Sequence, residues 1–600
     1  MVDLKAKPFY LNDEQIKWVE DTINSLTLEE KVGQLFVHLT GSRTEEDIEN
    51  DIKLTRCGGI RFNPGTNEEM WNMNYFFQKH SKVPILSAVN VECGGNGATR
   101  QGTFVGSEMK VAATNKPEYA YKLGQICGRE TKATGSNWAF APITDLVLNW
   151  HNPGIVTRGF GDQVEQVSLL SREYFKGMSE SGILCAMKHF PGDGQDERDP
   201  HIGTAVNTLS MEEWDKSYGK IYADMIDAGI QSVMTGHIMM PAYQKHFNPN
   251  CKPEDLKPAT ICKELVTDLL RGKLGFNGLV VSDASHMVGL TGHGKRSDIV
   301  PDAINAGVDM FLFFNDIEED TRYMTEAYKS GRISEERMHD ALSRILAMKC
   351  LAGLNNFSID KFPSKEGLSV IGCEEHKKVA KEITDHGITL AKQTGKKVLP
   401  FDKKKIKKIL LVPVGPKSDA TLVLSGQAAD NTKMESLLKS GLEAHGFKVE
   451  IYVDPIKKMM DMVAKMTPEQ IAEMQKQSKN QENKGMYGMK QAVHNLTDEY
   501  DAVIAFADVP HTMKTVQRLE WALSKGGWDN PWYVEELPVI FVSFSSPFHL
   551  ADVSQVKNYI NCYDAHEETV KALVDKLVGV SEFKGVSPVD VFCGMIDTRI

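Results

Sequence analysis

The sequence predicts an α/β protein in which a TIM-like (β/α)8 barrel is followed by an αβα-sandwich second domain. Three observations predict it. Eight short apolar runs alternate with amphipathic helical patterns before residue 320, eight strands close a TIM barrel, and strand and helix patterns resume after residue 403. The predicted bounds are 1–351 for the barrel, 352–402 for a connector with one helix, and 403–600 for the second domain. The pattern also leaves an open doubly wound sheet as an alternative.

The eight runs are rich in β-branched and aromatic residues, as strands are. Between them, segments such as NEEMWNMNYFFQKH and QVEQVSLLSREYFKGM place apolar residues at helical spacing, which favours parallel strands joined by helical crossovers. The expected strands are QLFVHL from Gln34, GGIRF from Gly58, PILSAVN from Pro84, WAFAPI from Trp138, ILCAMKHF from Ile183, QSVMTG from Gln231, GLVVSD from Gly278 and DMFLFF from Asp309.

A helix is expected over 334–351, where Ser334 precedes two acidic residues that suit a first turn. A further helix is expected at about 374–393 in the connector. The second domain should hold strands at ILLVPVG, TLVLSG, KVEIYV, DAVIAFAD and PVIFVSF. A polar, Met-rich stretch over 457–490 is typical of helix with a flexible tip.

Composition excludes several classes of protein. The chain has 600 residues, and 69 Lys and Arg stand against 81 Asp and Glu, for a formal charge of −12, so no broad basic field for nucleic acid is present. No run of 18 apolar residues predicts a membrane span, and the N-terminal residues lack a signal-peptide pattern. Ten scattered cysteines fit free thiols. We therefore expect a cytoplasmic protein.

Reactive residues of a βα barrel stand at the carboxyl ends of its strands. Polar side chains follow most of the expected strands, and a purely structural role does not anticipate this. They are Asn90 and Glu92 after the third strand, Asp145 after the fourth with Arg158 on the loop beyond, Lys188 and His189 at the fifth, His237 after the sixth and Asp283 after the seventh. Internal ion pairs are the alternative for Arg158, Lys188 and His189. No compact metal-ligand motif joins the histidines.

The loop after the fifth strand is the most informative. Gly192 and Gly194 allow unusual backbone angles, and Asp199 and His201 stand two residues apart, so both side chains can lie on one side of an extended segment. A carboxylate bonded to imidazole orients the ring and raises its pKa, as a general acid requires. Asp283 is a candidate anion that attacks a sugar or stabilises positive charge. Surface decoration and a helix N-cap are the structural alternatives for the loop pair and for Asp283.

Together these residues resemble glycoside hydrolase family 3, in particular its β-N-acetylglucosaminidase (NagZ-like) branch. The matching segments stand in the family order over most of the first 290 residues. They are Ala141-Pro142-Ile143-Thr144-Asp145, Arg158 in RGFGD, Lys188-His189-Phe190-Pro191-Gly192-Asp193-Gly194, Asp199-Pro200-His201, Met234-Thr235-Gly236-His237, and Val281-Ser282-Asp283 with Met287.

The resemblance implies a retaining exo-acting β-N-acetylhexosaminidase that needs no cofactor or metal and takes a small amino-sugar glycoside. Asp283 matches the nucleophile, His201 the general acid and base, and Asp199 its assistant. Arg158, Lys188 and His189 match ligands of sugar hydroxyls. The chain departs from the family at Asn90, where the family usually has an acidic residue that contacts a distal sugar hydroxyl. An amide there changes the polarity of that hydrogen bond, and Glu92 can supply the missing carboxylate. A second departure is Asp193, where the bacterial branch often has His.

Other functions remain open on the sequence. A phosphorylase on the same residues is favoured by the histidine, which repels phosphate less than a carboxylate does. A β-glucosidase fits less well, because those relatives place their acid elsewhere. A lyase or aldolase that forms a Schiff base at Lys188, or a non-catalytic sugar-binding protein, are the more distant alternatives. Oligomeric state is not indicated by any pattern.

Overall fold

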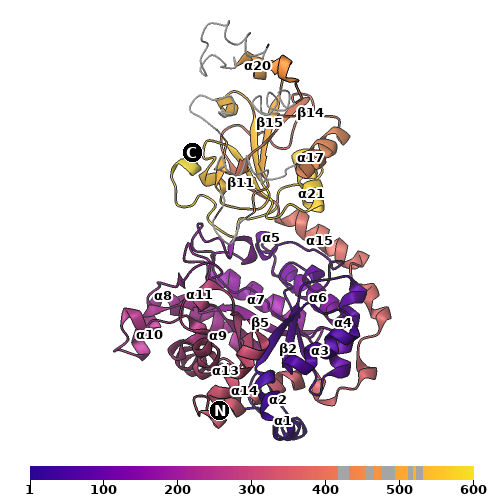
Figure 1. The fold of residues 1–600 in the computed structure, drawn as a ribbon. Coiled ribbons are helices and arrows are strands. Elements are labelled where there is room, and N and C mark those ends of the chain that lie inside the picture. The colour runs from indigo at the N-terminus through magenta and orange to yellow at the C-terminus, as the bar shows by residue number, and fades with distance from the viewer. Residues whose placement is uncertain are drawn as a thin grey trace. The chain divides into compact units, whose positions relative to one another are not determined.

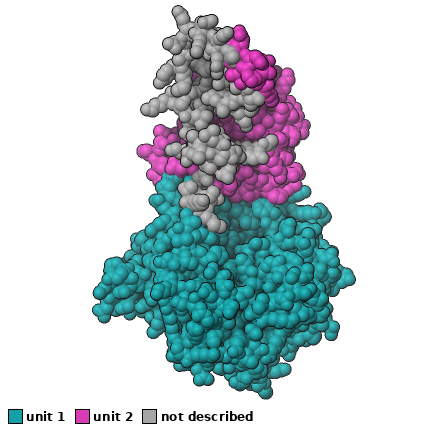
Figure 2. Space-filling view, viewed as in Figure 1, with its two compact units in different colours: residues 1–383, 512–516 teal, residues 384–511, 517–600 magenta. Residues whose placement is uncertain are grey.

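The computed structural model describes residues 1–416, 432–452, 465–471, 473, 493–510, 516, 518–521 and 532–600. The chain forms two compact units, one of residues 1–383 with 512–516 and one of residues 384–511 with 517–600 (Figures 1 and 2). The expected connector, 352–402, is therefore divided: its residues to 383 belong to the first unit and the rest to the second.

The first unit is a closed barrel of eight parallel strands, as predicted, and the open sheet is excluded (Figure 1). Around the barrel the strands follow in the order β1, β10, β9, β7, β5, β4, β3, β2. Each lies at one of the eight expected runs. They are β1 (Phe36–Thr40), β2 (Gly59–Phe62), β3 (Leu86–Val89), β4 (Trp138–Ala139), β5 (Leu184–Phe190), β7 (Ser232–Thr235), β9 (Leu279–Ala284) and β10 (Met310–Leu312). A separate small sheet pairs β6 (Ala205–Val206) with β8 (Ile238–Met239).

Helices cover the outside of the barrel, and local sequence sets where several begin. Thr66 caps α4 (Asn67–His80) and forms a reciprocal capping box with Glu69. Ser334 accepts a hydrogen bond from the Arg337 amide at the start of the expected 334–351 helix. The helices are α1 (Asp13–Ser25), α2 (Leu28–Gln34), α3 (Glu45–Thr55), α4 (Asn67–His80), α5 (Glu108–Ala113), α6 (Pro117–Ala133), α7 (Val164–Ser179), α8 (Met211–Lys216), α9 (Tyr218–Ala228), α10 (Pro241–Phe247), the π-helix η5 (Glu264–Lys273), α11 (Val288–Thr291), α12 (Arg296–Ala306), α13 (Ile317–Lys329) and α14 (Glu335–Leu351).

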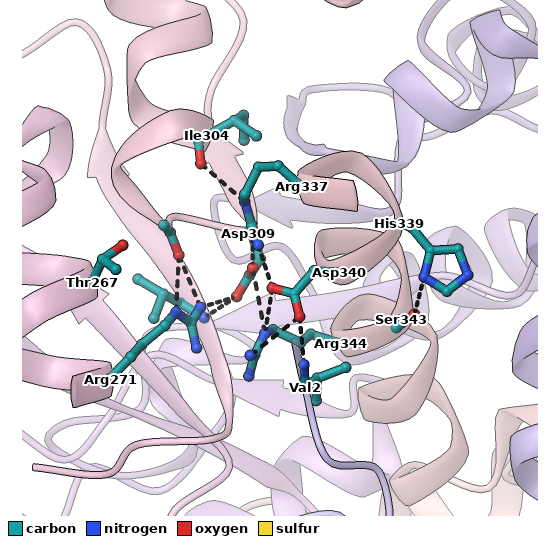
Figure 3. Close-up of polar contacts among 12 residues, drawn as sticks. Val2, Thr267, Arg271, Ile304, Asp309, Arg337, His339, Asp340, Ser343 and Arg344 are labelled. Atoms are coloured by element: carbon teal, nitrogen blue, oxygen red, sulfur yellow. Dashed lines mark hydrogen bonds and ion pairs between the residues drawn. The ribbon is translucent and has the colours of Figure 1, made fainter. Parts of the chain in front are cut away.

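A buried ionic network lies at the amino-terminal end of β9 and β10 (Figure 3). Asp309, just before β10, is fully buried and accepts a hydrogen bond from the Val280 amide at 2.8 Å. Asp309 and Asp340 together pair with three guanidinium groups, those of Arg271, Arg337 and Arg344. The paired charges tie η5 and α14 to the strands, at the end of the barrel opposite to the strands' carboxyl ends.

The second unit contains a six-stranded sheet in the order β11, β18, β17, β15, β12, β14, with β11 antiparallel to its neighbour and the other pairs parallel. This confirms an α/β second domain. Its sheet strands are β11 (Thr389–Gln393), β12 (Lys408–Pro413), β14 (Lys448–Ile451), β15 (Ala502–Ala507), β17 (Val539–Ser543) and β18 (Asn558–Asn561), and its longer helices are α17 (Thr432–Ala444) and α21 (Glu567–Leu577).

One expectation for this part of the chain needs correction. The helix expected over 374–393 ends earlier, because α15 (Glu374–Gly387) reaches a glycine and the next residues pair with β18. β18 itself was not expected. The strand predicted at TLVLSG lies outside the described residues, as does most of the Met-rich stretch over 457–490. Within the described ranges, no helix is both long and apolar enough to cross a membrane.

Candidate active site

The carboxyl ends of the parallel strands place the expected polar side chains on one face of the barrel. Most of the candidate residues fall into three interacting groups. These are the triad Glu92–Arg158–Lys188, the pair Asp145–His189 and the pair Asp199–His201, with Asp283 and His237 beside them.

Glu92 is the centre of an ionic triad. Its carboxylate accepts two hydrogen bonds from Arg158, at 2.9 and 3.0 Å, and one from Lys188 Nζ at 2.6 Å. The side chain of Lys188 is only 3% exposed, and that of Glu92 13%. Burial by itself raises the pKa of Glu92, but the charges of Arg158 and Lys188 hold it well below its usual range. Glu92 is therefore anionic, and its hydrogen bonds orient two cations.

Asp145 is fully buried and orients His189. Its Oδ2 lies 2.7 Å from His189 Nδ1, and both of its oxygens accept the His189 amide at 3.1 Å. Its Oδ1 also accepts the amide of Asp193 at 2.8 Å. One carboxylate thus fixes the end of β5 and the start of the loop that follows it, and it holds the His189 ring through Nδ1.

The loop after β5 is held by close packing. Gly192 has φ +118° and lies against the ring of Tyr218, where a Cβ would approach to 2.3 Å. Gly194 has φ +92° and lies against the Leu146 carbonyl, so both predicted glycines adopt the left-handed region that favours glycine. Further on, His201 Nδ1 lies 2.6 Å from Asp199 Oδ1, which also accepts the His201 amide at 2.8 Å.

The Asp199–His201 pair favours a protonated ring. The hydrogen bond to Asp199 raises the pKa of His201, burial opposes the rise, and the charges of Asp199 and Asp283 add to it. Asp199 is buried, whereas His201 is partly exposed, so the ring's Nε2 can reach a ligand. An imidazole whose pKa is raised and whose ring is open on one side is suited to donate a proton.

Asp283 stands at the end of β9. Its Oδ1 accepts the Ala284 amide at 2.7 Å, and the side chain is partly exposed. Burial by itself raises the pKa of Asp283. The nearby imidazoles of His189 and His237 lower it by more, so that its pKa lies below the usual range. The carboxylate is therefore anionic and within electrostatic range of the protonatable His201.

His237 is fully buried, and both ring nitrogens have partners. Nδ1 lies 2.9 Å from Thr260 Oγ1 and Nε2 lies 2.9 Å from the Ala284 carbonyl. Burial lowers the pKa of His237. The ring thus supports the backbone directly after Asp283 through Ala284, and both of its nitrogens already have partners.

The turn after Asp283 also holds the histidine loop. In α11 the Val288 amide donates to the His201 carbonyl at 3.2 Å, and the Gly289 amide donates to the Pro200 carbonyl at 2.8 Å. A Cβ at Gly289 would lie 2.9 Å from that Pro200 oxygen, so glycine permits the close approach. The segments that carry Asp283 and His201 are therefore joined through their backbones.

Asn90 follows β3 and is exposed, and it belongs to none of the three groups described above. Two further residues escaped the sequence prediction. Glu108, in α5, is fully buried, and burial together with the charge of Glu92 raises the pKa of Glu108 well above its usual range. Its Oε1 accepts the Ile143 amide at 3.3 Å. Arg61 in β2 is within electrostatic range of Glu92. In the sequence, the only mark of Arg61 is that it is a polar residue inside an apolar strand, and no sequence pattern indicates Glu108.

A metal site is not evident among these groups. Within the described part of the chain, one trio has ligand atoms close enough to hold an ion, namely Glu45, Glu49 and His80. Lys79 Nζ lies 2.7 Å from Glu45 Oε1, so a cation already pairs with this carboxylate. The strand-end groups comprise an anionic carboxylate, an imidazole paired with a carboxylate, and two cations whose hydrogen-bond donors Glu92 orients.

Comparisons with known proteins agree with this chemistry. The model of the glycosyl hydrolase family 3 N-terminal domain matches residues 27–348. A protein of Cellulomonas fimi described as beta-N-acetylglucosaminidase/beta-glucosidase is 36% identical over 601 residues, covering 100% of both chains.

Two solved structures are also similar. One, titled beta-glucoside phosphorylase BglX, has a TM-score of 0.86 and 34% identity and covers 99% of each chain. The other, a family 3 beta-N-acetylglucosaminidase from Paenibacillus sp., has a TM-score of 0.72 and covers 94% of this chain and 99% of its own, but at 24% identity it shows the fold alone.

Proposed function

This chain belongs to glycosyl hydrolase family 3, and on that premise we propose that it is a retaining exo-acting β-N-acetylglucosaminidase. The observation that carries the proposal is the pairing of Asp199 with His201 beside an anionic Asp283. Protonated His201 gives its proton to the leaving oxygen while Asp283 attacks the anomeric carbon. A covalent glycosyl-aspartate forms, and the aglycone leaves as an alcohol.

In the second step the now neutral His201 takes a proton from water, which attacks the anomeric carbon and releases Asp283 as a carboxylate. Arg158, Lys188 and His189 bind hydroxyl groups of the terminal sugar. Glu92 orients Arg158 and Lys188. Three hydrogen bonds from these cations leave the Glu92 carboxylate one acceptor site, so Glu92 can still supply the acceptor that Asn90 lacks.

A second candidate is a β-glycoside phosphorylase that uses the same Asp283 and His201. The similar structure titled beta-glucoside phosphorylase covers nearly the whole of this chain, which supports it. After proton transfer His201 is neutral, whereas a carboxylic acid in its place would be an anion and would repel phosphate. Phosphate would then replace water as the acceptor and yield a sugar 1-phosphate.

Product analysis separates these functions. The enzyme is incubated with 4-nitrophenyl N-acetyl-β-glucosaminide, and with the β-glucoside for comparison, in phosphate and in phosphate-free buffer. We expect free N-acetylglucosamine in both buffers, formed first as the β-anomer because configuration is retained. Sugar 1-phosphate as the main product in phosphate would establish the phosphorylase instead. Cleavage of neither glycoside would contradict both proposals.

Asp199→Asn is expected to move the basic limb of the pH profile of kcat/KM to lower pH. The Asp199 hydrogen bond and charge raise the pKa of His201, so in the wild type the proton that His201 donates is retained to higher pH. Without the carboxylate the pKa of His201 falls, and activity is lost sooner as the pH rises. An unchanged limb would show that His201 is not the acid, provided that the variant keeps the wild-type circular dichroism spectrum.

A further inference from the structure

Asn152 lies in the loop between β4 and α7, and its side chain is 1% exposed. Its Nδ2 donates to Asp193 Oδ1 at 3.0 Å and to the Asp196 carbonyl at 2.8 Å. Its Oδ1 accepts the amides of Gly154 at 3.0 Å and Ile155 at 2.9 Å. A side-chain amide offers two donor hydrogens and two acceptor lone pairs, so every hydrogen bond that Asn152 can make is made.

The acceptor side of Asn152 fixes the turn that carries Arg158. The Arg158 amide donates to the Ile155 carbonyl at 2.6 Å, and its Nη1 donates to the Gly154 carbonyl at 3.1 Å. The same turn lies close to the acid pair, because a Cβ built on Gly154 would lie 3.2 Å from Asp199 Oδ2. The backbone that the Asn152 oxygen holds thus bonds Arg158 and lies against the carboxylate behind His201.

The donor side of Asn152 fixes the loop that carries His201. Asp193 and Asp196 stand before Asp199 in this loop, and the Val206 amide donates to Asp196 Oδ2 at 2.8 Å, which closes the loop at its base. The Asp193 amide donates to Asp145, the partner of His189. One buried amide therefore joins the loop of the acid to the turn of the sugar-binding cation.

We propose that Asn152 is a positioning residue of the reaction. It joins the loop that carries His201 to the turn that carries Arg158, and it thereby places His201 within reach of the leaving oxygen. The inference rests on the proposed role of His201 as general acid. An amide fits here because it offers two donor hydrogens on one side and an acceptor oxygen on the other, which neither a hydroxyl group nor an imidazole does. Aspartate would preserve the acceptor side but place an anion against Asp193, whose pKa burial and Asp145 raise to about 7.

The test is Asn152→Asp with substrates that differ in their leaving group. This variant retains oxygens for the Gly154 and Ile155 amides and loses both donors to the His201 loop. For a phenyl glycoside, whose departure needs protonation, kcat/KM is expected to fall by about 100-fold, the lower end of what general acid catalysis contributes. For the 2,4-dinitrophenyl glycoside, which departs without a proton, we expect a loss below about 5-fold.

Asn137→Asp is the matched control. Asn137, just before β4, is half-buried, donates from Nδ2 to the Ile85 carbonyl at 3.1 Å and accepts the Ser87 amide at 2.9 Å. The same chemical change there is expected to affect both substrates alike. Should Asn152→Asp also affect both alike, or neither, the positioning role is overturned.

His201→Ala separates this proposal from the proposed function. If the loss of kcat/KM in His201→Ala is the same for the phenyl and the 2,4-dinitrophenyl glycoside, the acid role of His201 is wrong and the proposed function fails. If His201→Ala shows a dependence on the leaving group and Asn152→Asp does not, only the role of Asn152 fails. Should Asn152→Asp not fold, Asn152→Ser decides, since a hydroxyl group cannot replace the two amide donors to the His201 loop; it must show the same dependence on the leaving group.

Discussion

Asp283→Asn is expected to lower kcat by about four orders of magnitude or more, the loss typical when a covalent nucleophile is removed. An amide oxygen still accepts the Ala284 amide bond that Asp283 Oδ1 makes at 2.7 Å, so the end of β9 is retained. The amide carries no charge, however, and does not attack the anomeric carbon. The loss should therefore appear in kcat, with little change in the free energy of unfolding.

The measurement is kcat on the 4-nitrophenyl glycoside, with covalent labelling as a second readout. A 2-deoxy-2-fluoro-β-glucoside with a dinitrophenolate leaving group, or a 5-fluoro analogue of the N-acetyl sugar, should add one glycosyl mass to the wild type and none to the variant. Asp316→Asn is the control, because Asp316 caps α13 through the Glu319 amide and Asn caps as well. Asp283→Asn with more than a tenth of wild-type kcat would refute the assignment.

The barrel could be predicted because its strands are buried on both faces and read as continuous apolar runs. β18 shows where this signal fails. Its sequence, Asn-Tyr-Ile-Asn, begins and ends on buried asparagines whose amides donate to the Val539 and Pro547 carbonyls. Such bonds allow polar residues inside a sheet, but their partners are distant in sequence and no local pattern reveals them.

Most residues of the candidate site could be predicted from the sequence, but their interactions could not. Polar residues at the ends of apolar strands marked Asp145, Lys188 and Asp283, and a spacing of two brought Asp199 to His201. Which groups pair across the barrel depends on the closed geometry: Glu92 binds Lys188, 96 residues further along the chain. Asn152 lies in a loop with no strand to mark it, and its importance follows only from partners that another loop supplies.

Glu92→Gln is expected to lower both stability and activity, because it removes the anion of the buried triad. Lys188, with 3% of its side chain exposed, would lose the only carboxylate that it contacts among the described residues. Breaking a buried pair in this way costs about 3–5 kcal/mol. We expect a value near the lower end, since the glutamine oxygen still accepts one hydrogen bond and Arg158 is partly solvated.

The dependence on pH distinguishes this charge effect from a packing defect. The pKa of Glu92 is lower in the folded protein than in the unfolded chain, where it is about 4.3. The stability that its charge contributes is therefore complete above about pH 5 and is lost as the pH falls toward the folded-state pKa. The difference in unfolding free energy between wild type and Glu92→Gln should be constant from pH 6 to 8 and should shrink in acid.

Urea unfolding measured from pH 8 down to about pH 3, below the unfolded-state pKa of glutamate, gives the difference, with Glu375→Gln as the control. Glu375 Oε1 lies 3.3 Å from Arg129 Nη1, but its side chain is 74% exposed, so the same substitution should change stability by less than about 1 kcal/mol.

On activity, Glu92→Gln should raise KM more than it lowers kcat, because Arg158 and Lys188 lose their orientation toward the sugar hydroxyls in the ground and transition states alike. A stability difference that does not shrink in acid would show that the triad acts through shape and not through charge.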